Sequence, residues 1–204
     1  MPSAVSRVRI VDVGDRGQAV AAPSDRTGDA ALARAAALGD RESFEVIVHR
    51  YGPSLYRYAA RTTGDPGDAQ DVVQEAFVAA WKALDRFDAR SSLKTWLFSI
   101  VAHKVADRNR RARAVPIDDA LMDAIPTGGG DPFAEATHQE LVDALDRALR
   151  ELPYRQRACW ILVEIEGMSQ AEVAAAQGMT PDAVRGHLFR ARRNLSERMA
   201  RWRR

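Results

Sequence analysis

The chain has little of the chemistry that builds disulfides or metal sites. It contains one cysteine, Cys159, and four histidines in 204 residues. A single thiol cannot close an internal disulfide, and the histidines do not fall at the spacing of metal ligands. Because Cys159 lies in an apolar run, at residues 158–162, we expect it to be a core thiol rather than a redox sensor. The sequence therefore predicts neither a metal ion nor a cofactor.

Long hydrophobic runs are also missing. No apolar stretch approaches the roughly 18 residues that cross a bilayer, and no compact apolar segment follows basic residues near the N-terminus. We therefore expect a cytoplasmic protein without membrane insertion. The sequence shows no glycine-rich phosphate loop, no catalytic pair of carboxylates and no nucleophile-base motif, which argues against an enzyme.

Charge is present, but it is unevenly distributed. The formal net charge is only +2. Residues 114–135 nevertheless contain five acids and no lysine or arginine, whereas residues 185–204 contain eight arginines opposed only by Glu197. Such a basic end is typical of a surface that binds the phosphate backbone of nucleic acids.

Apolar spacing along the chain predicts an all-α protein of two small helical domains. Residues 1–28 show no sustained period and are predicted to be a flexible tail, with at most a short strand at 8–13. A first domain follows at 29–113. Residues 114–135, rich in acid, proline and glycine, are predicted to be a flexible linker. A second domain occupies 136–204.

Local signals mark the helices of the first domain. A short helix at 30–38 is predicted to stop at Gly39, and Asp40 to cap a second helix that Pro53 kinks or interrupts. Asp65 and Pro66 mark the start of the clearest helix, whose apolar residues follow a three-then-four spacing up to Leu84. The next helix begins after Ser91 or Ser92 and ends in a basic run.

The second domain contains the signature of a helix-turn-helix. Helices are predicted at 133–152 and 154–166. Ser169 and Glu172 then form a capping box, and Gly178 supplies a turn with positive φ. Thr180 caps a further helix with Pro181 at its first position.

On this last helix, Val184 and Leu188 are predicted to be buried, which leaves a basic outer face. Arginine can donate two hydrogen bonds to guanine in the major groove and can also bind phosphate. A solvated helix end, which binds nothing, is the alternative interpretation. The capped first helix and the glycine turn favour DNA binding.

With these motifs the chain resembles the extracytoplasmic-function (ECF) sigma factors, compact two-domain members of the sigma-70 family. The resemblance spans residues 29–199, and its strongest pieces follow in order: Asp68-Ala69-Gln70-Asp71-Val72-Val73-Gln74-Glu75-Ala76-Phe77 through Trp81, Thr95-Trp96-Leu97, Leu152-Pro153, and Glu166-Gly167-Met168-Ser169 through Arg190-Ala191-Arg192-Arg193. It implies that the first domain is sigma region 2, the second region 4 and the acidic stretch their connector.

The resemblance implies three sets of site residues. Core RNA polymerase is expected to be bound through the clamp helices of its largest subunit, and also through the flap of its second subunit; the implied clamp contacts are Asp68, Asp71, Gln74, Glu75 and Phe77. The upstream (-35) promoter element is expected to be bound by Arg185, Gly186, His187, Phe189, Arg190 and Arg193. The downstream (-10) element, where the DNA melts and a flipped-out base is held, is expected to be bound by Ser91, Ser92, Trp96, His103, Lys104, Arg108 and Arg111. Trp96 either stacks on such a base or belongs to the core.

Two positions depart from the family pattern. His103 stands where many members have asparagine, and Gly186-His187 stands where a Ser-Arg pair is more usual. Both departures bear on the bases that are contacted. The family is commonly held inactive by an anti-sigma partner that covers both domains, so such a partner is implied as well.

A stand-alone helix-turn-helix regulator, with the first domain as a sensor or dimerisation unit, is the main rival interpretation. A helical adaptor that only holds partners is another, and the concentrated C-terminal arginines count against it. The motif series of the first domain favours the sigma factor.

Overall fold

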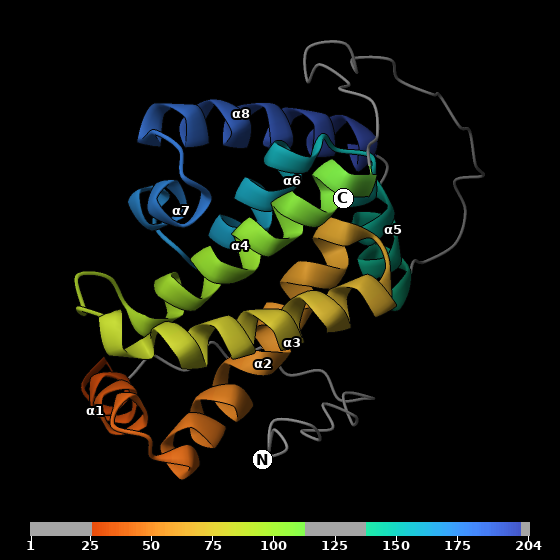
Figure 1. Ribbon diagram of the computed structural model, residues 1–204. Coiled ribbons are helices and arrows are strands. Elements are labelled where there is room, and N and C mark those ends of the chain that lie inside the picture. Colours follow the sequence, from red (N-terminus) through yellow and green to blue (C-terminus); the bar gives the residue numbers. More distant parts are fainter. Residues whose placement is uncertain (1–25, 113–137, 201–204) are drawn as a thin grey trace.

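The computed structural model describes residues 26–112 and 138–200, and within these ranges the chain is helical with no strand. The first module contains α1 (Arg26–Ala37), α2 (Arg41–Thr63), α3 (Pro66–Ala83), the 3-10 turn η1 (Leu84–Arg86) and α4 (Leu93–Ala112). The second contains α5 (His138–Arg150), α6 (Tyr154–Trp160), the π-helical turn η2 (Ile161–Ile165), α7 (Gln170–Gln177) and α8 (Pro181–Arg198). The predicted all-α, two-domain fold is confirmed (Figure 1).

The predicted helix starts are confirmed by their caps. Asp40 accepts a hydrogen bond from the backbone N–H of Glu42 at 3.1 Å, and Asp65 accepts one from Asp68 at 2.8 Å. The Ser92 hydroxyl accepts from the N–H of Thr95 at 3.0 Å at the start of α4. The predicted tail overlaps α1, which begins at Arg26; the remaining tail residues, the predicted strand at 8–13 and the predicted linker lie outside the described residues.

Pro53 does not interrupt α2, contrary to one of the two expectations for it. The helix continues from Arg41 to Thr63 with Pro53 inside it. A proline removes one backbone donor, and a helix tolerates this when packing holds the two halves together. Tyr51, Leu55 and Tyr58 on either side of Pro53 are all buried, so the packing of this face outweighs the lost hydrogen bond.

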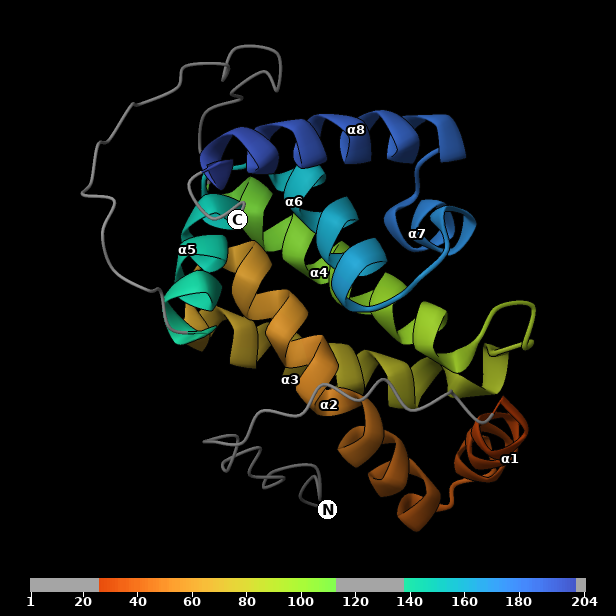
Figure 2. The same cartoon turned by 180° about the vertical axis from the view of Figure 1, so that it is seen from behind.

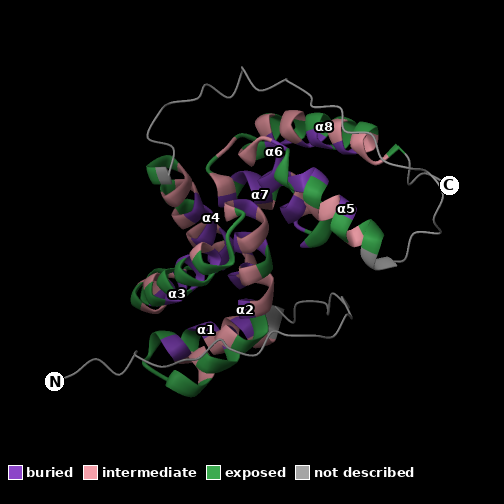
Figure 3. Ribbon diagram, turned by 90° about the vertical axis from the view of Figure 1, so that its right-hand side faces the viewer, coloured by how far each residue is buried: buried purple, intermediate pink, exposed green. Residues whose placement is uncertain are grey.

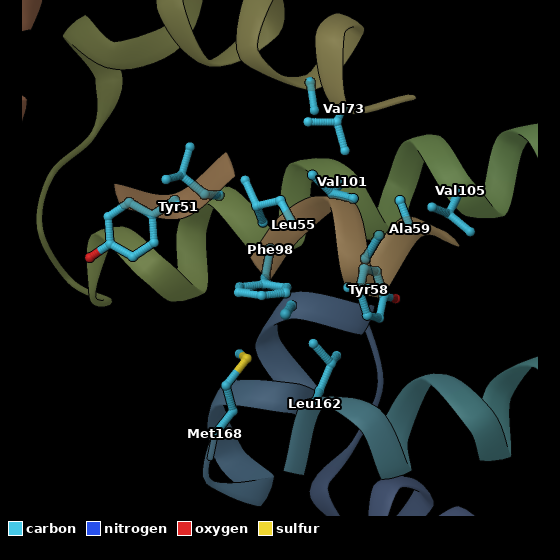
Figure 4. Close-up of a cluster of buried hydrophobic side chains, with 14 of the residues drawn as sticks. Tyr51, Leu55, Tyr58, Ala59, Val73, Phe98, Val101, Val105, Leu162 and Met168 are labelled. Carbon is cyan, nitrogen blue, oxygen red and sulfur yellow. The ribbon is translucent and has the colours of Figure 1, made fainter. Parts of the chain in front are cut away.

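The two modules pack against each other and share one hydrophobic core. Figure 4 shows Tyr58 of α2 and Phe98 of α4 pointing toward Leu162 and Met168 of the second module. All four side chains are at most 4% exposed. The rings of Tyr58 and Phe98 meet edge to face, with centroids 5.6 Å apart. Apolar burial of this kind is the main favourable term in such a contact, so the domains form one body here.

Polar contacts surround this shared core. Gln177 donates to the Tyr58 hydroxyl at 2.8 Å, and Arg157 donates to the backbone carbonyl of Thr62 at 2.9 Å. Arg61 of α2 also pairs with Asp146 of α5 at 3.0 Å. Seen from behind, α8 crosses above α6, while α4 lies between α3 and α7 (Figure 2). Helices α2 and α4 of the first module therefore both contact the second module.

Two other expectations concern single features. Cys159 is fully buried, as predicted for a core thiol, and desolvation raises its pKa to about 11. Among the described helices, none is both long enough and apolar enough to span a bilayer.

Candidate nucleic-acid interface

The helix-turn-helix of the second module has the predicted geometry. Ser169 and Glu172 satisfy each other's backbone donors: the N–H of Ser169 donates to the Glu172 carboxylate at 2.9 Å, and the N–H of Glu172 donates to the Ser169 hydroxyl at 3.2 Å. Gly178 ends α7 at φ +62°, a value that glycine adopts without steric cost. Thr180 then accepts from the N–H of Ala183 at 3.2 Å and starts α8.

The outer face of α8 carries the predicted upstream contacts. Val184 and Leu188 are buried, as expected, whereas Arg185, Phe189, Arg190 and Arg193 are exposed. Figure 3 shows exposed as well as buried segments along α8. Phe189 is 68% exposed. An exposed aromatic ring among arginines suits the thymine methyl group and the guanine edge of a major groove.

Gly186 and His187 lie on the same helix beneath the side chain of Arg190. A Cβ added at Gly186 would meet Nη1 of Arg190 at 3.5 Å, and Nη2 of Arg190 lies 3.3 Å from Nδ1 of His187. The guanidinium is thus folded back along its own helix. These two departures from the family pattern therefore affect where Arg190 lies as well as their own contacts.

Some arginines of α8 form ion pairs within the second module, which the count of arginines in the sequence could not show. Arg192 pairs with Glu164 of η2 at 2.6 Å, and Arg198 pairs with Glu151 at 2.8 Å. These pairs join α8 to the rest of the second module. Two of the five arginines of α8 are thus paired with acids elsewhere in the second module.

At the start of α4, a small cavity lies beside the loop that joins it to η1. The cavity measures about 200 Å³ and is lined by the loop residues Phe87, Ala89, Arg90, Ser91, Ser92 and Leu93 and by Asp29 and Ala30 of α1. Ala89 adopts φ +58°, a conformation that costs a residue with a Cβ about 1–2 kcal/mol and that is found at functional loops. The predicted residues Ser91 and Ser92 therefore both line this cavity.

Trp96 is half-buried and packs on Phe87, with ring centroids 5.2 Å apart and planes tilted by 46°. Trp96 also packs against the hydrophobic core, as the second alternative expects, whereas its stacking on a base stays a prediction.

The sequence predicted no site residue in α1, and Asp29 is only the first residue of the predicted first domain. Its carboxylate is buried, 2.5 Å from Nη1 of Arg50, and also accepts a hydrogen bond from the Tyr51 hydroxyl. Burial, followed by this hydrogen bond, raises the pKa of Tyr51. These contacts fix α1 against α2 and thereby hold one wall of the cavity.

Two predicted sites turn out to be one cluster of ion pairs between α3 and α4. Lys104, predicted to bind DNA, pairs with Glu75, predicted to bind polymerase, at 2.9 Å. Arg108 pairs with Asp68 and lies 3.9 Å from Asp71. The hydrogen bonds that Arg108 and Lys104 donate lower the pKa values of Asp68 and Glu75, and the bond that Arg108 donates to Asp68 raises the pKa of Arg108. A groove of about 540 Å³ runs along this cluster and is lined by Asp71, Gln74, Glu75, Val78, Ala79, Lys82 and Lys104.

Phe77 packs in the hydrophobic core of the first module, and its role as a polymerase contact stays a prediction. Its side chain is 6% exposed and meets Phe44 edge to face at a centroid distance of 6.2 Å. Apolar and acidic residues alternate along the sequence of α3, and the motif alone does not show which of them face the core. Of the other predicted residues, His103 and Arg111 are exposed on α4, with Nδ1 of His103 2.6 Å from the carbonyl oxygen of Ser99.

The modules are also joined by an ion pair from α4 to the residue that follows η2. Nζ of Lys94 donates to the backbone carbonyl of Glu166 and lies 3.7 Å from its carboxylate. Burial raises the pKa of Glu166, and the charge of Lys94 opposes this rise. The residue that follows Lys94, Thr95, donates a hydrogen bond to Glu172 of α7 at 3.1 Å.

Zero-length cross-linking is expected to capture this contact. A carbodiimide couples an amine to a neighbouring carboxylate, so the intact protein should yield an amide between Lys94 and Glu166, detected by peptide mass spectrometry. The pair formed by Lys104 and Glu75, 2.9 Å apart within the first module, is the internal control. The side chain of Glu166 is only 6% exposed, so recovery of the control cross-link together with coupling of Glu166 to an added small amine would show that the modules are apart in solution.

Within the described ranges, no three His, Cys, Asp or Glu side chains gather in a way that could hold a metal ion. These residues instead form a helix-turn-helix with a basic face, a cavity of about 200 Å³ at the start of α4, and a groove lined by acidic and basic side chains.

Comparison with known proteins agrees with these features. The family model of sigma-70 region 2 matches residues 47–115, and that of sigma-70 region 4 matches residues 143–195. The RNA polymerase sigma factor NccH of Alcaligenes xylosoxydans xylosoxydans is 37% identical over 181 residues, which cover 85% of this chain and 95% of NccH. The ECF sigma factor SigM of Mycobacterium tuberculosis is 34% identical over 172 residues, covering 82% of this chain and 83% of SigM.

Solved structures agree as well. CnrH in complex with the cytosolic domain of CnrY superposes with a TM-score of 0.63 at 35% identity, covering 85% of this chain and 97% of CnrH. RpoE in complex with the anti-sigma factor NepR, from Bartonella quintana, gives a TM-score of 0.62 at 25% identity, covering 78% of this chain and 98% of RpoE. The chain belongs to the ECF sigma factors of the sigma-70 family, a family of transcription initiation factors.

Proposed function

We propose that this sigma factor binds core RNA polymerase in the bacterial cytoplasm and directs it to promoters with two recognition surfaces. The second module reads the -35 element with α8, and the first module recognises the -10 element and stabilises its melted form. The observation that best supports this proposal is that one chain combines two features: a helix-turn-helix whose basic face is exposed, and a cavity of about 200 Å³ at the start of α4. A protein with only one of these two surfaces could bind DNA without polymerase, so it is their combination that supports a sigma factor.

On the upstream element, Arg185, Arg190 and Phe189 carry base readout because they form the exposed outer face of α8. Arg193 lies further along the same face and binds phosphate, which positions the helix without reading sequence. Gly186 and His187 shape the contact through the position of Arg190. This division of roles follows from exposure and from the general preference of arginine for guanine and phosphate.

On the downstream element, an unstacked base enters the cavity beside Ser91 and Ser92, with Phe87 and Trp96 as its aromatic neighbours. New stacking and hydrogen bonds must offset the few kcal/mol that unstacking costs. His103, Lys104, Arg108 and Arg111 lie further along α4 and bind the backbone of the DNA there. The four residues are on one helix, so they follow one strand.

The packed arrangement of the two modules must open for this function. About 25 base pairs separate elements centred at -35 and -10, and at about 3.4 Å per base pair they lie roughly 85 Å apart. Helix α8 has 18 residues, a length of about 27 Å. In the structure α7, which leads into α8, contacts α4 directly through Thr95 and Glu172. The two surfaces therefore cannot span a promoter until the modules separate.

Polymerase and an anti-sigma partner would act on this opening in opposite directions. Asp68, Asp71, Gln74 and Glu75 of α3 form the surface for the clamp helices of the largest subunit, and the second module binds the flap of the second subunit. NepR is described as an anti-sigma factor in its complex with RpoE. By analogy, a partner of this chain would hold the packed arrangement in place.

Run-off transcription tests the proposed function. Purified protein is added to core polymerase with a promoter library, and the transcripts are sequenced. We expect transcripts that start at a fixed distance from a shared two-part motif. Duplex binding by the protein alone, together with no transcript in the presence of core, would favour a stand-alone helix-turn-helix regulator instead.

A further inference from the structure

Lys104 and Arg108 are already paired before any nucleic acid is present. Their partners Glu75 and Asp68 lie on α3, the helix that carries the proposed polymerase surface. Asp71 and Glu75 have side chains 62% and 61% exposed, whereas those of Lys104 and Arg108 are 30% and 36% exposed. The side chain of Asp68 is 36% exposed, the same as that of Arg108, so a partner that approaches this groove from solvent meets Asp71 and Glu75 more readily than the cations.

We propose that α3 and α4 form a charge-exchange site, in which docking of a basic polymerase surface on the α3 acids releases Lys104 and Arg108 to bind DNA phosphates. The proposal rests on the proposed function, because it assumes that α3 meets polymerase and α4 meets DNA. It adds a coupling between the two events. Without polymerase, the first module binds DNA weakly because its cations are occupied by its own carboxylates.

The spacing of the acids identifies the chemistry of the occupant. Asp68, Asp71 and Glu75 recur three and four residues apart, so they form one acidic stripe along α3. Gln74, Val78 and Ala79 line the same groove and give it a neutral, partly apolar floor. A helix that presents arginine or lysine side chains fits such a stripe by charge complementarity, and polymerase supplies this helix in the proposed function.

The exchange requires little reorganisation of the protein. All four groups of the two closest pairs are partly exposed, and solvent-exposed ion pairs contribute little stability. The cations sit on long flexible side chains that can turn toward a strand lying along α4. The backbones of α3 and α4 are held by the buried side chains of Val73, Val101 and Val105, so only the side chains need to change partners.

Salt dependence of DNA binding by the full-length protein without polymerase tests the exchange. The probe is a fluorescent single-stranded DNA of mixed sequence, followed by anisotropy. The double variant Asp68→Asn with Glu75→Gln removes the internal partners while preserving side-chain shape. Each released cation that binds a phosphate steepens the dependence of log K on log salt by about 0.7 for single strands, so the expected change is about 1.4 in slope and roughly tenfold in affinity near 0.1 M salt.

The matched control is Glu45→Gln with Asp85→Asn. Both acids are exposed in the first module, and the change in net charge is the same, but neither is paired with α4. This control should change the affinity by less than about threefold and leave the slope unchanged, since long-range charge effects are screened over about 10 Å at 0.1 M salt. Adding Lys104→Met and Arg108→Met to the double variant should abolish its gain.

An equal gain in the control and the paired-acid variant would show that net charge alone is responsible, and would overturn the exchange. No gain in the paired-acid variant, with its thermal unfolding unchanged, would overturn it too. Failure of the proposed function looks different: wild-type protein would then give no promoter-specific transcript with core polymerase, whatever its DNA affinity.

Discussion

Replacing Arg190 by alanine is expected to lower transcription from a cognate promoter by about tenfold to a hundredfold while leaving assembly with core polymerase unchanged. The guanidinium is exposed on the outer face of α8, close to Gly186 and His187. A bidentate contact from arginine to a guanine contributes about 1–3 kcal/mol of discrimination, and each 1.4 kcal/mol corresponds to a tenfold change. The measurement is run-off transcription with saturating core, on promoters that vary only in the upstream element.

Arg192→Ala is the matched control for this experiment. Arg192 is on the same helix and is exposed, but it pairs with Glu164 of η2 at 2.6 Å. Its loss should leave the promoter preference intact. If Arg192→Ala altered the preferred upstream sequence as strongly as Arg190→Ala, the assignment of the outer face of α8 to base readout would be wrong. Relaxed preference at one base position only would identify the base that Arg190 contacts.

Filling the cavity beside α4 is expected to prevent promoter melting. Ala30→Phe places a ring where the unstacked base would lie, since Ala30 lines the cavity of about 200 Å³. Losing the contacts that offset a few kcal/mol of unstacking should reduce formation of the melted complex by roughly a hundredfold. Permanganate reactivity of thymines in the downstream element, or fluorescence of 2-aminopurine placed there, reports this directly.

Ala31→Phe is the control for the cavity variant. Ala31 is the next residue of α1 but is exposed, so the added ring points away from the packed face. It should melt the promoter as wild type does. Binding of both variants to core and to duplex upstream DNA should be normal. A second variant, Asp29→Asn, weakens the attachment of α1 to Arg50 and Tyr51 without filling the cavity, and should reduce melting more mildly.

On a template already melted at the downstream element, the cavity can be tested separately from strand opening. The wild-type protein should still favour one base at the position that enters the cavity, whereas Ala30→Phe should not distinguish the four bases. Equal base preference in both proteins would show that the cavity holds no base, even if the sigma factor itself is active.

Several site residues could be placed from the sequence because their positions follow from local rules. The outward direction of Arg185, Phe189 and Arg190 follows from helical periodicity once Val184 and Leu188 are taken as buried. Ser91 and Ser92 follow from the need to cap α4. The motif of α3 places an apolar and an acidic face on the same helix, and only tertiary packing, such as that of Phe77 on Phe44, decides which side chains are covered.

By itself, the sequence determined the helices, their caps, the glycine turn of the helix-turn-helix and the family, since these depend on contacts within a few residues. The caps at Asp40, Asp65, Ser169 and Thr180 all form as their local patterns require. Tertiary structure alone decided which charges are paired, because Glu75 and Lys104 are 29 residues apart and meet only when α3 packs on α4. It likewise decided that Asp29 of α1 completes the cavity beside α4, and that Tyr58 and Phe98 join the two modules through side chains whose partners lie far along the chain.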